Sequence, residues 1–201
     1  HWCRGLRCRL SWVDRWCRAA DPIAQGLHVS GHGGWGLLHH RHGHVQQLGT
    51  PKEIYDTPAS VYVATFMGSP AMNIIPARVE MHNGIPHARI TDSEGRPQLL
   101  RLSQGNLVAG RDILLGIRPE AITDPEGADR TSRNIVSLGN RVAVTEPAGA
   151  DTFVTMTLGG RDAIARMRAD ASVAAGQDFD FAVNMDKAVA FDPATEMRIA
   201  P

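Results

Sequence analysis

The feature that most limits the fold of this chain is a series of short apolar runs after Pro70, which Gly, Pro, Asn and Asp residues separate. Runs of this length and spacing are typical of β-strands joined by turns. The stretch 178–181, Asp-Phe-Asp-Phe, alternates polar and apolar side chains, as a strand with one buried face does. The sequences at 82–84 and 158–160 contain Asn-Gly and Gly-Gly, which favour tight hairpin turns.

This pattern predicts a mainly β fold, an antiparallel barrel of the oligonucleotide/oligosaccharide-binding (OB) type over residues 70–201. The predicted strands are Ile74–Glu80, Pro86–Thr91, Gln98–Leu102, Ile113–Arg118, Arg133–Thr145, Thr152–Leu158, Asp162–Met167, Phe179–Asn184 and Val189–Phe191.

Two short helices are predicted before the barrel, within residues 51–67. Thr50, Pro51 and Glu53 form the pattern of a capping box with proline at the first helical position. Thr57-Pro58 repeats the cap and proline signal, and Gly68 supplies a stop before Pro70.

Residues 1–44 differ in composition from the rest of the chain. They contain all four Trp, all three Cys and seven of the nine His, and they carry six Arg against two Asp. No helical or strand periodicity runs through them. We therefore divide the chain into an anomalous segment, 1–44, which we expect to be disordered, a helical segment, 45–69, and the barrel, 70–201.

Three interpretations of residues 1–44 stay open. Cys3, Cys8 and Cys17 with His28 and His32 are metal-ligand types, although their spacing is not that of usual zinc sites. A divergent N-terminus is the second interpretation. The third is translation out of frame in a fragment that begins at His1 and not at Met, because shifted codons for 39–42 permit an Ile-Ile-Val-Met strand.

Charge and composition argue against several function classes. The formal net charge is zero, and the barrel region carries 14 basic and 17 acidic residues with four aromatics, all Phe. A nucleic-acid groove needs positive charge and stacking aromatics, so we expect no nucleic-acid partner. No motif for a metalloprotease or a serine hydrolase is present, which disfavours a free-standing enzyme.

Four charged residues are candidate contact sites. Arg118 and Glu120 lie in a Gly-Ile-Arg-Pro-Glu motif, where a polar contact that fixes the barrel or a dimer seam is favoured over a catalytic pair. Glu146 and Asp151 flank a Gly-containing turn. A turn role is the default for them, and a ligand role at a barrel mouth is the alternative.

The chain resembles the ATP-binding subunits of sugar-importing ABC transporters, of the maltose and glycerol-3-phosphate type. The run Gly43–Tyr55 and the run Val63–Asn73 are similar to the end of the ATP-binding domain of this family. Gly116–Glu120, Glu146–Thr152 and Phe191–Thr195 resemble three successive landmarks of the regulatory barrel that follows it, in the same order and spacing.

The resemblance implies the C-terminal regulatory and dimerising portion of an import ATPase. It implies a homodimer through the barrel, permease subunits in the membrane, an inhibitory regulator as a further partner, and a peripheral cytoplasmic location. The alternative is a stand-alone OB-like module that binds a small ligand.

The ATP-hydrolysing motifs of that family are missing from this chain. A Walker A loop needs a Lys that neutralises phosphate and a hydroxyl that holds Mg²⁺, and neither Lys52 nor Lys187 lies in such a loop. ATP and Mg²⁺ belong to the intact parent. We expect this chain by itself to carry no cofactor and neither to bind nor to hydrolyse ATP.

Overall fold

The computed structural model describes residues 27–30, 36–41, 44–103 and 107–199. The chain divides into two units, His1–Ile54 and Tyr55–Pro201.

The first unit contains a small antiparallel sheet of β1 (Leu27–Ser30), β2 (Gly36–Arg41) and β3 (His44–Gly49). We expected no regular structure before residue 44, and β1 and β2 correct this expectation. We had used only the periodicity of apolar side chains as a signal for strands. Backbone N–H and C=O groups can pair in a sheet without such a periodicity. The three cysteines and His32 of the zinc alternative lie outside the described residues.

The two predicted helices are present as α2 (Pro51–Asp56) and α3 (Val61–Phe66). The capping box of α2 is confirmed, because the Thr50 N–H donates to Glu53 Oε2 at 2.8 Å and the Glu53 N–H donates to Thr50 Oγ1 at 3.2 Å. The cap of α3 differs from the prediction. Its N-cap is Ser60, whose hydroxyl accepts from the Val63 N–H, because α3 begins only at Val61.

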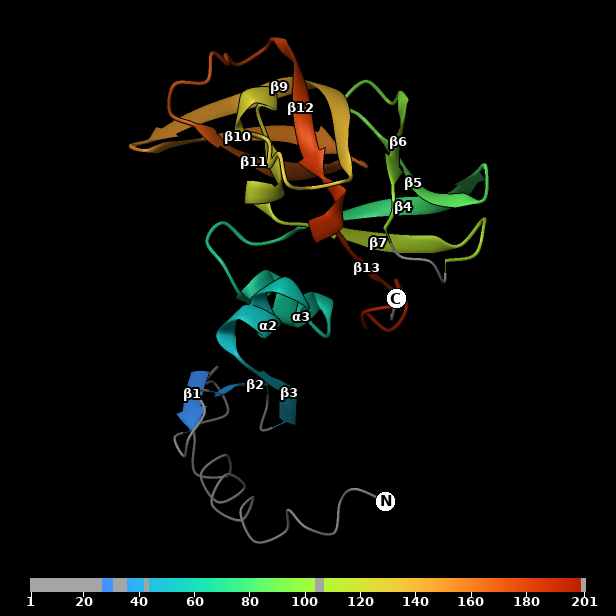
Figure 1. Cartoon of the computed structure of the whole chain (residues 1–201), viewed down its shortest axis with the longest axis vertical. Helices are drawn as coiled ribbons and strands as arrows, with labels where there is room; N and C mark the ends of the chain where they lie inside the picture. Colours follow the sequence, from blue (N-terminus) through green and yellow to red (C-terminus); the bar gives the residue numbers. More distant parts are fainter. Residues whose placement is uncertain (1–26, 31–35, 42–43, 104–106, 200–201) are drawn as a thin grey trace, which may run out of the picture. The chain divides into compact units, whose positions relative to one another are not determined.

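The second unit contains two five-stranded antiparallel sheets (Figure 1). One has the order β13-β7-β4-β5-β6, with β4 (Asn73–His82), β5 (Ile85–Thr91), β6 (Pro97–Arg101), β7 (Asp112–Ile117) and β13 (Val189–Phe191). The other has the order β11-β10-β9-β12-β8, with β8 (Ile122–Thr123), β9 (Ile135–Ala148), β10 (Asp151–Leu158), β11 (Arg161–Arg168) and β12 (Asp178–Asn184). Short 3₁₀ turns lie at Pro119–Ala121, Pro125–Gly127 and Met185–Lys187.

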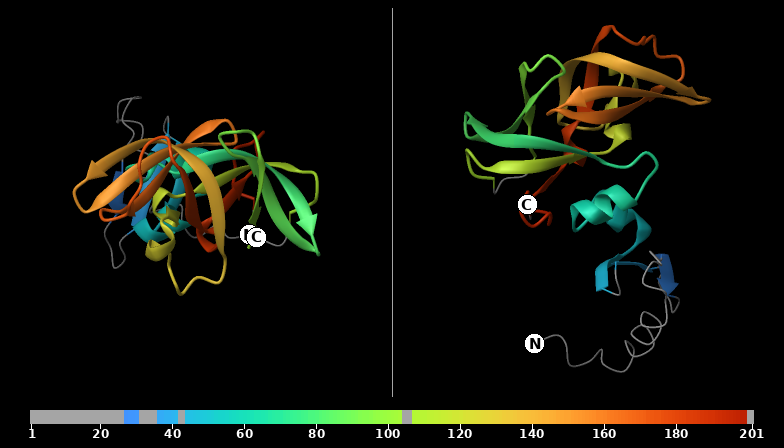
Figure 2. Two further views of the ribbon diagram at one scale, coloured as in Figure 1. Left: turned by 90° about the horizontal axis from the view of Figure 1, so that it is seen from above. Right: turned by 180° about the vertical axis from the view of Figure 1, so that it is seen from behind.

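The strands form a nearly closed barrel, which confirms the predicted fold class. The sheet that contains β9 curls until its edge strands β11 and β8 lie against each other, and β11 also contacts β4 of the other sheet. The two views of Figure 2 show the orange strands β9 and β10 and the green strands β4 and β5 in separate, twisted layers. All nine predicted strands have a counterpart, whereas the two-residue β8 was too short to be predicted.

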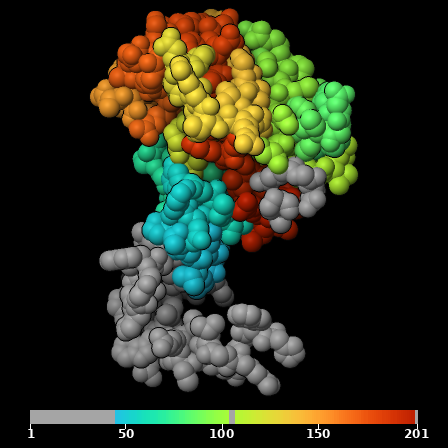
Figure 3. Space-filling model, viewed as in Figure 1, coloured from blue at the N-terminus to red at the C-terminus, as the bar shows by residue number. Residues whose placement is uncertain are grey.

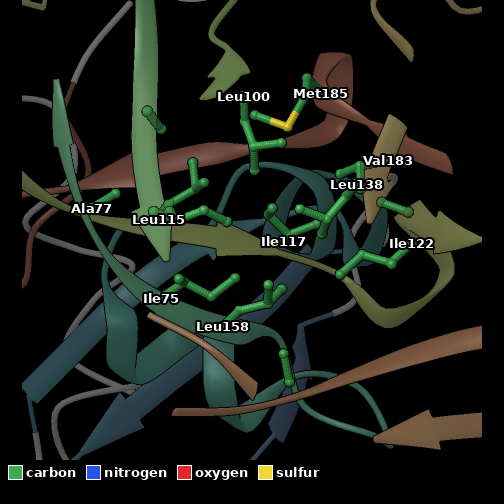
Figure 4. Close-up of a cluster of buried hydrophobic side chains, with 14 of the residues drawn as sticks. Ile75, Ala77, Leu100, Leu115, Ile117, Ile122, Leu138, Leu158, Val183 and Met185 are labelled. Carbon is green, nitrogen blue, oxygen red and sulfur yellow. The ribbon is translucent and has the colours of Figure 1, made fainter. Parts of the chain in front are cut away.

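One apolar core fills the space between the sheets (Figure 4). Ile75, Leu115 and Ile117 reach it from one sheet, and Leu138 and Leu158 from the other, each at most 1% exposed. On the face drawn in Figure 3, side chains from the green, yellow and red parts of the sequence pack side by side. Long-range packing of this kind, and not local propensity, holds the strands in place.

Buried asparagines join the two sheets where their strands do not pair. Asn73 on β4 donates from Nδ2 to the Ile164 carbonyl and accepts from the Ile164 N–H, both at 2.8 Å. Its amide therefore replaces a neighbouring strand for Ile164 on the edge strand β11. Asn140 on β9 donates to the Thr157 carbonyl of its own sheet at 2.8 Å and accepts at 3.1 Å from the N–H of Ser93, which follows β5 of the other sheet.

We predict that Asn73→Ala lowers the free energy of unfolding by about 1–3 kcal/mol, because both backbone groups of Ile164 lose their partner in a part-buried position. Equilibrium urea unfolding followed by circular dichroism measures this loss. The exposed Ser137→Ala on β9 is the control and should change stability by less than about 0.5 kcal/mol. Equal stability of the two variants would contradict the role assigned to Asn73.

Candidate functional site

A buried arginine forms the centre of the site. Arg118 follows β7 and is only 3% exposed. Its guanidinium donates to the carbonyls of Ala64 at 3.0 Å and Tyr55 at 2.8 Å, and also to the carbonyl of Met67. Ala64 and Met67 lie at the end of α3, where backbone carbonyls have no partner within the helix. Arg118 therefore caps α3 from the barrel side, and its charge is favourable at a helix C-terminus.

Tyr55 connects Arg118 to Glu120. The Arg118 guanidinium carbon lies 3.9 Å from the centre of the Tyr55 ring, a cation–π contact, and the Tyr55 hydroxyl donates to Glu120 Oε1 at 2.6 Å. Burial and the hydrogen bond to Glu120 raise the pKa of Tyr55 to about 12. Burial lowers the pKa of Arg118, and the charges of Tyr55, Glu120 and Asp56 oppose this shift. The guanidinium stays protonated, as arginine does in proteins.

Gly68 leaves room for this contact. Its φ of 106° lies in a region that side chains rarely adopt, and a Cβ there would lie 3.2 Å from Arg118 Nη1 and 3.3 Å from the Tyr55 ring. The glycine that the sequence identified as a helix stop thus also admits the guanidinium. We call Arg118, Tyr55, Glu120 and the carbonyls of Ala64 and Met67 the arginine clamp.

An ion pair lies beside the clamp. Arg166 on β11 donates to Asp151 Oδ2 at 2.7 Å, and this hydrogen bond raises the pKa of Arg166, with smaller contributions from the charges of Glu120 and Tyr55. Glu146 lies on the same face of the sheet, because its cross-strand partner Phe153 on β10 is also the partner of Arg166.

The four predicted site residues therefore have different surroundings. Arg118 and Glu120 belong to one cluster, but Tyr55 stands between them and they make no direct hydrogen bond among the described residues. Asp151 pairs with Arg166, and Glu146 is exposed. Sequence reasoning did not connect Tyr55 with these residues. It also missed Arg166, since alternation within β11 does not show which residue faces Glu120.

No group of three or more His, Cys, Asp or Glu side chains is placed to hold a metal ion in the described part of the chain. No described helix is long and apolar enough to cross a membrane. The clamp joins structural elements, so its chemistry is that of a fixed contact between the helical segment from Tyr55 onward and the barrel.

Comparison with known proteins agrees with this architecture. The family model of the MalK OB fold domain matches residues 68–122, so this stretch is similar to that domain. The chain is related to the ATP-binding subunits of sugar and glycerol-3-phosphate ABC importers, which confirms the family predicted from its motifs.

Three relatives illustrate the range of this family. The chain is 37% identical over 160 residues to the sulfoquinovosyl glycerol transport ATP-binding protein SmoE of Agrobacterium fabrum, with 79% of this chain covered. It is 34% identical over 160 residues to the oligosaccharides import ATP-binding protein MsmX of Bacillus subtilis, and 37% identical over 161 residues to the sn-glycerol-3-phosphate import ATP-binding protein UgpC of Ralstonia nicotianae, with 78% covered in both cases. The chain spans 42% of each relative's length.

We predict that Arg118→Met lowers the free energy of unfolding by about 2–4 kcal/mol, because three carbonyls lose their donor. Hydrogen exchange followed by mass spectrometry should show that the substitution increases the exchange rate of α3 more than that of β10. Arg141→Met, at an exposed position on β9, is the control and should leave both readouts unchanged. Unchanged exchange in α3 of the Arg118 variant would contradict the clamp.

The raised pKa of Tyr55 predicts a pH dependence. The folded protein favours the neutral phenol, so this contribution to stability is complete below pH 10, the ordinary pKa, and is lost as the pH rises toward about 12. Urea unfolding between these pH values should show a fall in stability that is smaller in Tyr55→Phe. An unchanged profile in Tyr55→Phe would contradict the assignment.

Proposed function

We propose that this chain is the C-terminal regulatory and dimerising portion of an ATP-binding subunit that energises import of a carbohydrate or of glycerol-3-phosphate. The observation that carries the proposal is the alignment of both the helices and the barrel with one continuous stretch of such subunits. The names of these relatives refer to transport of sulfoquinovosyl glycerol and to import of oligosaccharides and sn-glycerol-3-phosphate. The transported substrate is left open, because nothing in the site distinguishes these compounds.

In the intact parent, ATP binding and hydrolysis would drive paired motor domains, and membrane-spanning permease subunits would receive the movement at the cytoplasmic face. The contribution of this chain is mechanical. The arginine clamp holds α3 against the barrel, so that a movement of α3 carries the barrel with it. An inhibitory regulator that binds the barrel would act through the same connection. ATP and Mg²⁺ would be held by the parent's motor domain.

The hairpin of β9 and β10 is the surface that we propose for dimerisation. Pairing of β9 with β12 ends at Arg141, so residues 144–148 pair only with β10 and leave one strand edge open. An open edge is a template for a further strand. Val144 on this edge is 47% exposed, and Glu146 extends the same exposed stretch. Dimer contacts of Glu146 and Asp151 remain part of this proposal.

We predict that the chain sediments as a dimer at tens of micromolar and that Val144→Asp makes it monomeric, because a buried unpaired charge opposes association. Sedimentation equilibrium measures the mass against the 21.8 kDa of one chain. Val108→Asp is the matched control, since Val108 is also exposed (69%) but lies outside the hairpin, and this variant should remain dimeric.

A monomeric unaltered chain would argue against this proposal and would favour the alternative, a stand-alone OB-like module for a small ligand. If the Val144→Asp variant remains dimeric, the proposal of a dimer stands, but the hairpin is not its contact surface.

A further inference from the structure

The C-terminal segment 192–199 turns back along β13 and adds a short stretch of extended chain to the barrel. The Asp192 N–H donates to the Met197 carbonyl at 2.9 Å, and the Ile199 N–H donates to the Ala190 carbonyl at 2.8 Å. These bonds cover the edge of β13 that does not pair with β7. The red end of the ribbon in Figure 1 follows this course from β13 toward α3.

The same segment holds the start of α3. The Val61 N–H donates to the Glu196 carbonyl, and the Arg198 N–H donates to the Ala59 carbonyl, both at 2.9 Å. Helix α3 begins at Val61, so these bonds act at its N-terminal end, whereas the arginine clamp acts at its C-terminal end. The segment therefore lies in a slot one strand wide, between β13 and the residues that precede α3.

The turn at the start of this segment is firmly anchored. Asp192 Oδ1 accepts hydrogen bonds from the N–H groups of Ala194 and Thr195, both at 3.0 Å. Asp192 Oδ2 forms an ion pair with Arg111 at 2.8 Å. The hydrogen bonds from Thr195, Arg111 and Ala194 lower the pKa of Asp192 to about 2. The turn belongs to the Phe191–Thr195 motif, to which neither the arginine clamp nor the dimer surface gives a role.

The residues after the turn are held more weakly. Met197 is 51% exposed and Glu196 is exposed, so few apolar contacts oppose their release. Glu196 also has a φ of 57°, a left-handed conformation that residues other than glycine rarely adopt. Ile199 is only partly buried against the core. An anchored turn followed by a weakly held strand can open and close while the turn stays in place.

We propose that residues 196–199 act as a strap that opens and closes while the barrel stays folded, and that the closed strap fixes the N-terminal end of α3. Opening breaks the hydrogen bonds of Val61, Arg198 and Ile199 together, so the strap has two states. With the strap open, the arginine clamp still holds the C-terminal end of α3. The strap thus sets how firmly the helical segment follows the barrel. It goes beyond the proposed function, and its test is independent of that proposal.

Hydrogen exchange of the full chain, followed for single amides by NMR, tests the strap. We expect similar protection factors, within about threefold, for the amides of Val61, Arg198 and Ile199. These amides should be at least about tenfold less protected than Val154 in the barrel strand β10. Protection equal to that of Val154 would mean that the strap opens only when the barrel unfolds, and would overturn the proposal.

Two substitutions should shift the strap in opposite directions. Asp192→Ala removes the anchor of the turn and should lower the protection of the Val61 and Arg198 amides at least about tenfold. Glu196→Gly relieves the positive φ and should raise the protection of the same amides about threefold. Asp180→Ala, at an exposed position on β12, is the matched control and should leave them unchanged.

The amide of Met67, at the C-terminal end of α3, separates the strap from the arginine clamp. Asp192→Ala should change the protection of Met67 less than that of Val61, and Arg118→Met should do the reverse. Equal changes at both amides in both variants would overturn the strap as a separate unit. If Asp192→Ala also lowers protection in β10, it destabilises the whole fold, and Glu196→Gly decides. Unchanged protection of Val61 in Glu196→Gly would then overturn the strap.

Discussion

The structure depends on how two sheets share one core although their edge strands do not all pair with each other. A strand edge that faces the other sheet leaves N–H and C=O groups without a ladder partner, which is costly away from water. Asn73 and Asn140 solve this problem with side-chain amides, which carry one donor group and one acceptor group as a peptide unit does. Because both are buried and each amide donates and accepts, they also fix which residues of the two sheets meet.

The same closure shapes the surface of the barrel. Where β4 and β5 part at Pro76, the Gly159 turn of the other sheet supplies a hydrogen bond to Thr91. The strands stay apart, and the space between them opens outward and not into the apolar core, since Ile75 next to Pro76 is 1% exposed on the inner face. A barrel that is closed by side chains and turns can therefore carry a hollow on its surface.

The sequence predicted those parts of the fold in which local signals suffice. Alternation placed the strands, Asn83-Gly84 and Gly159-Gly160 placed two hairpins with positive φ, and the capping box placed α2. The N-cap of α3 was misplaced at Thr57, because that residue and Ser60 carry the same local signal and the packing of Val63 and Ala64 decides between them. Pairing order and the partners of buried polar groups depend on contacts between distant residues, which no local pattern contains.

In the candidate site, too, the sequence predicted what local signals show and missed what depends on distant contacts. The Gly-Ile-Arg-Pro-Glu motif identified Arg118 and Glu120, but its spacing cannot show that Tyr55, 63 residues earlier, lies between them. A buried guanidinium without a carboxylate in contact is costly by itself. Here that cost is offset by the helix-end carbonyls, the Tyr55 ring and the nearby charge of Glu120. These groups reach the guanidinium only when α3 packs against the barrel. If α3 moved away from the barrel, the charge of Arg118 would stay buried without these partners, or the core beside it would be exposed. The clamp therefore favours one position of α3. A contact of this kind therefore also specifies where the helical segment lies on the barrel.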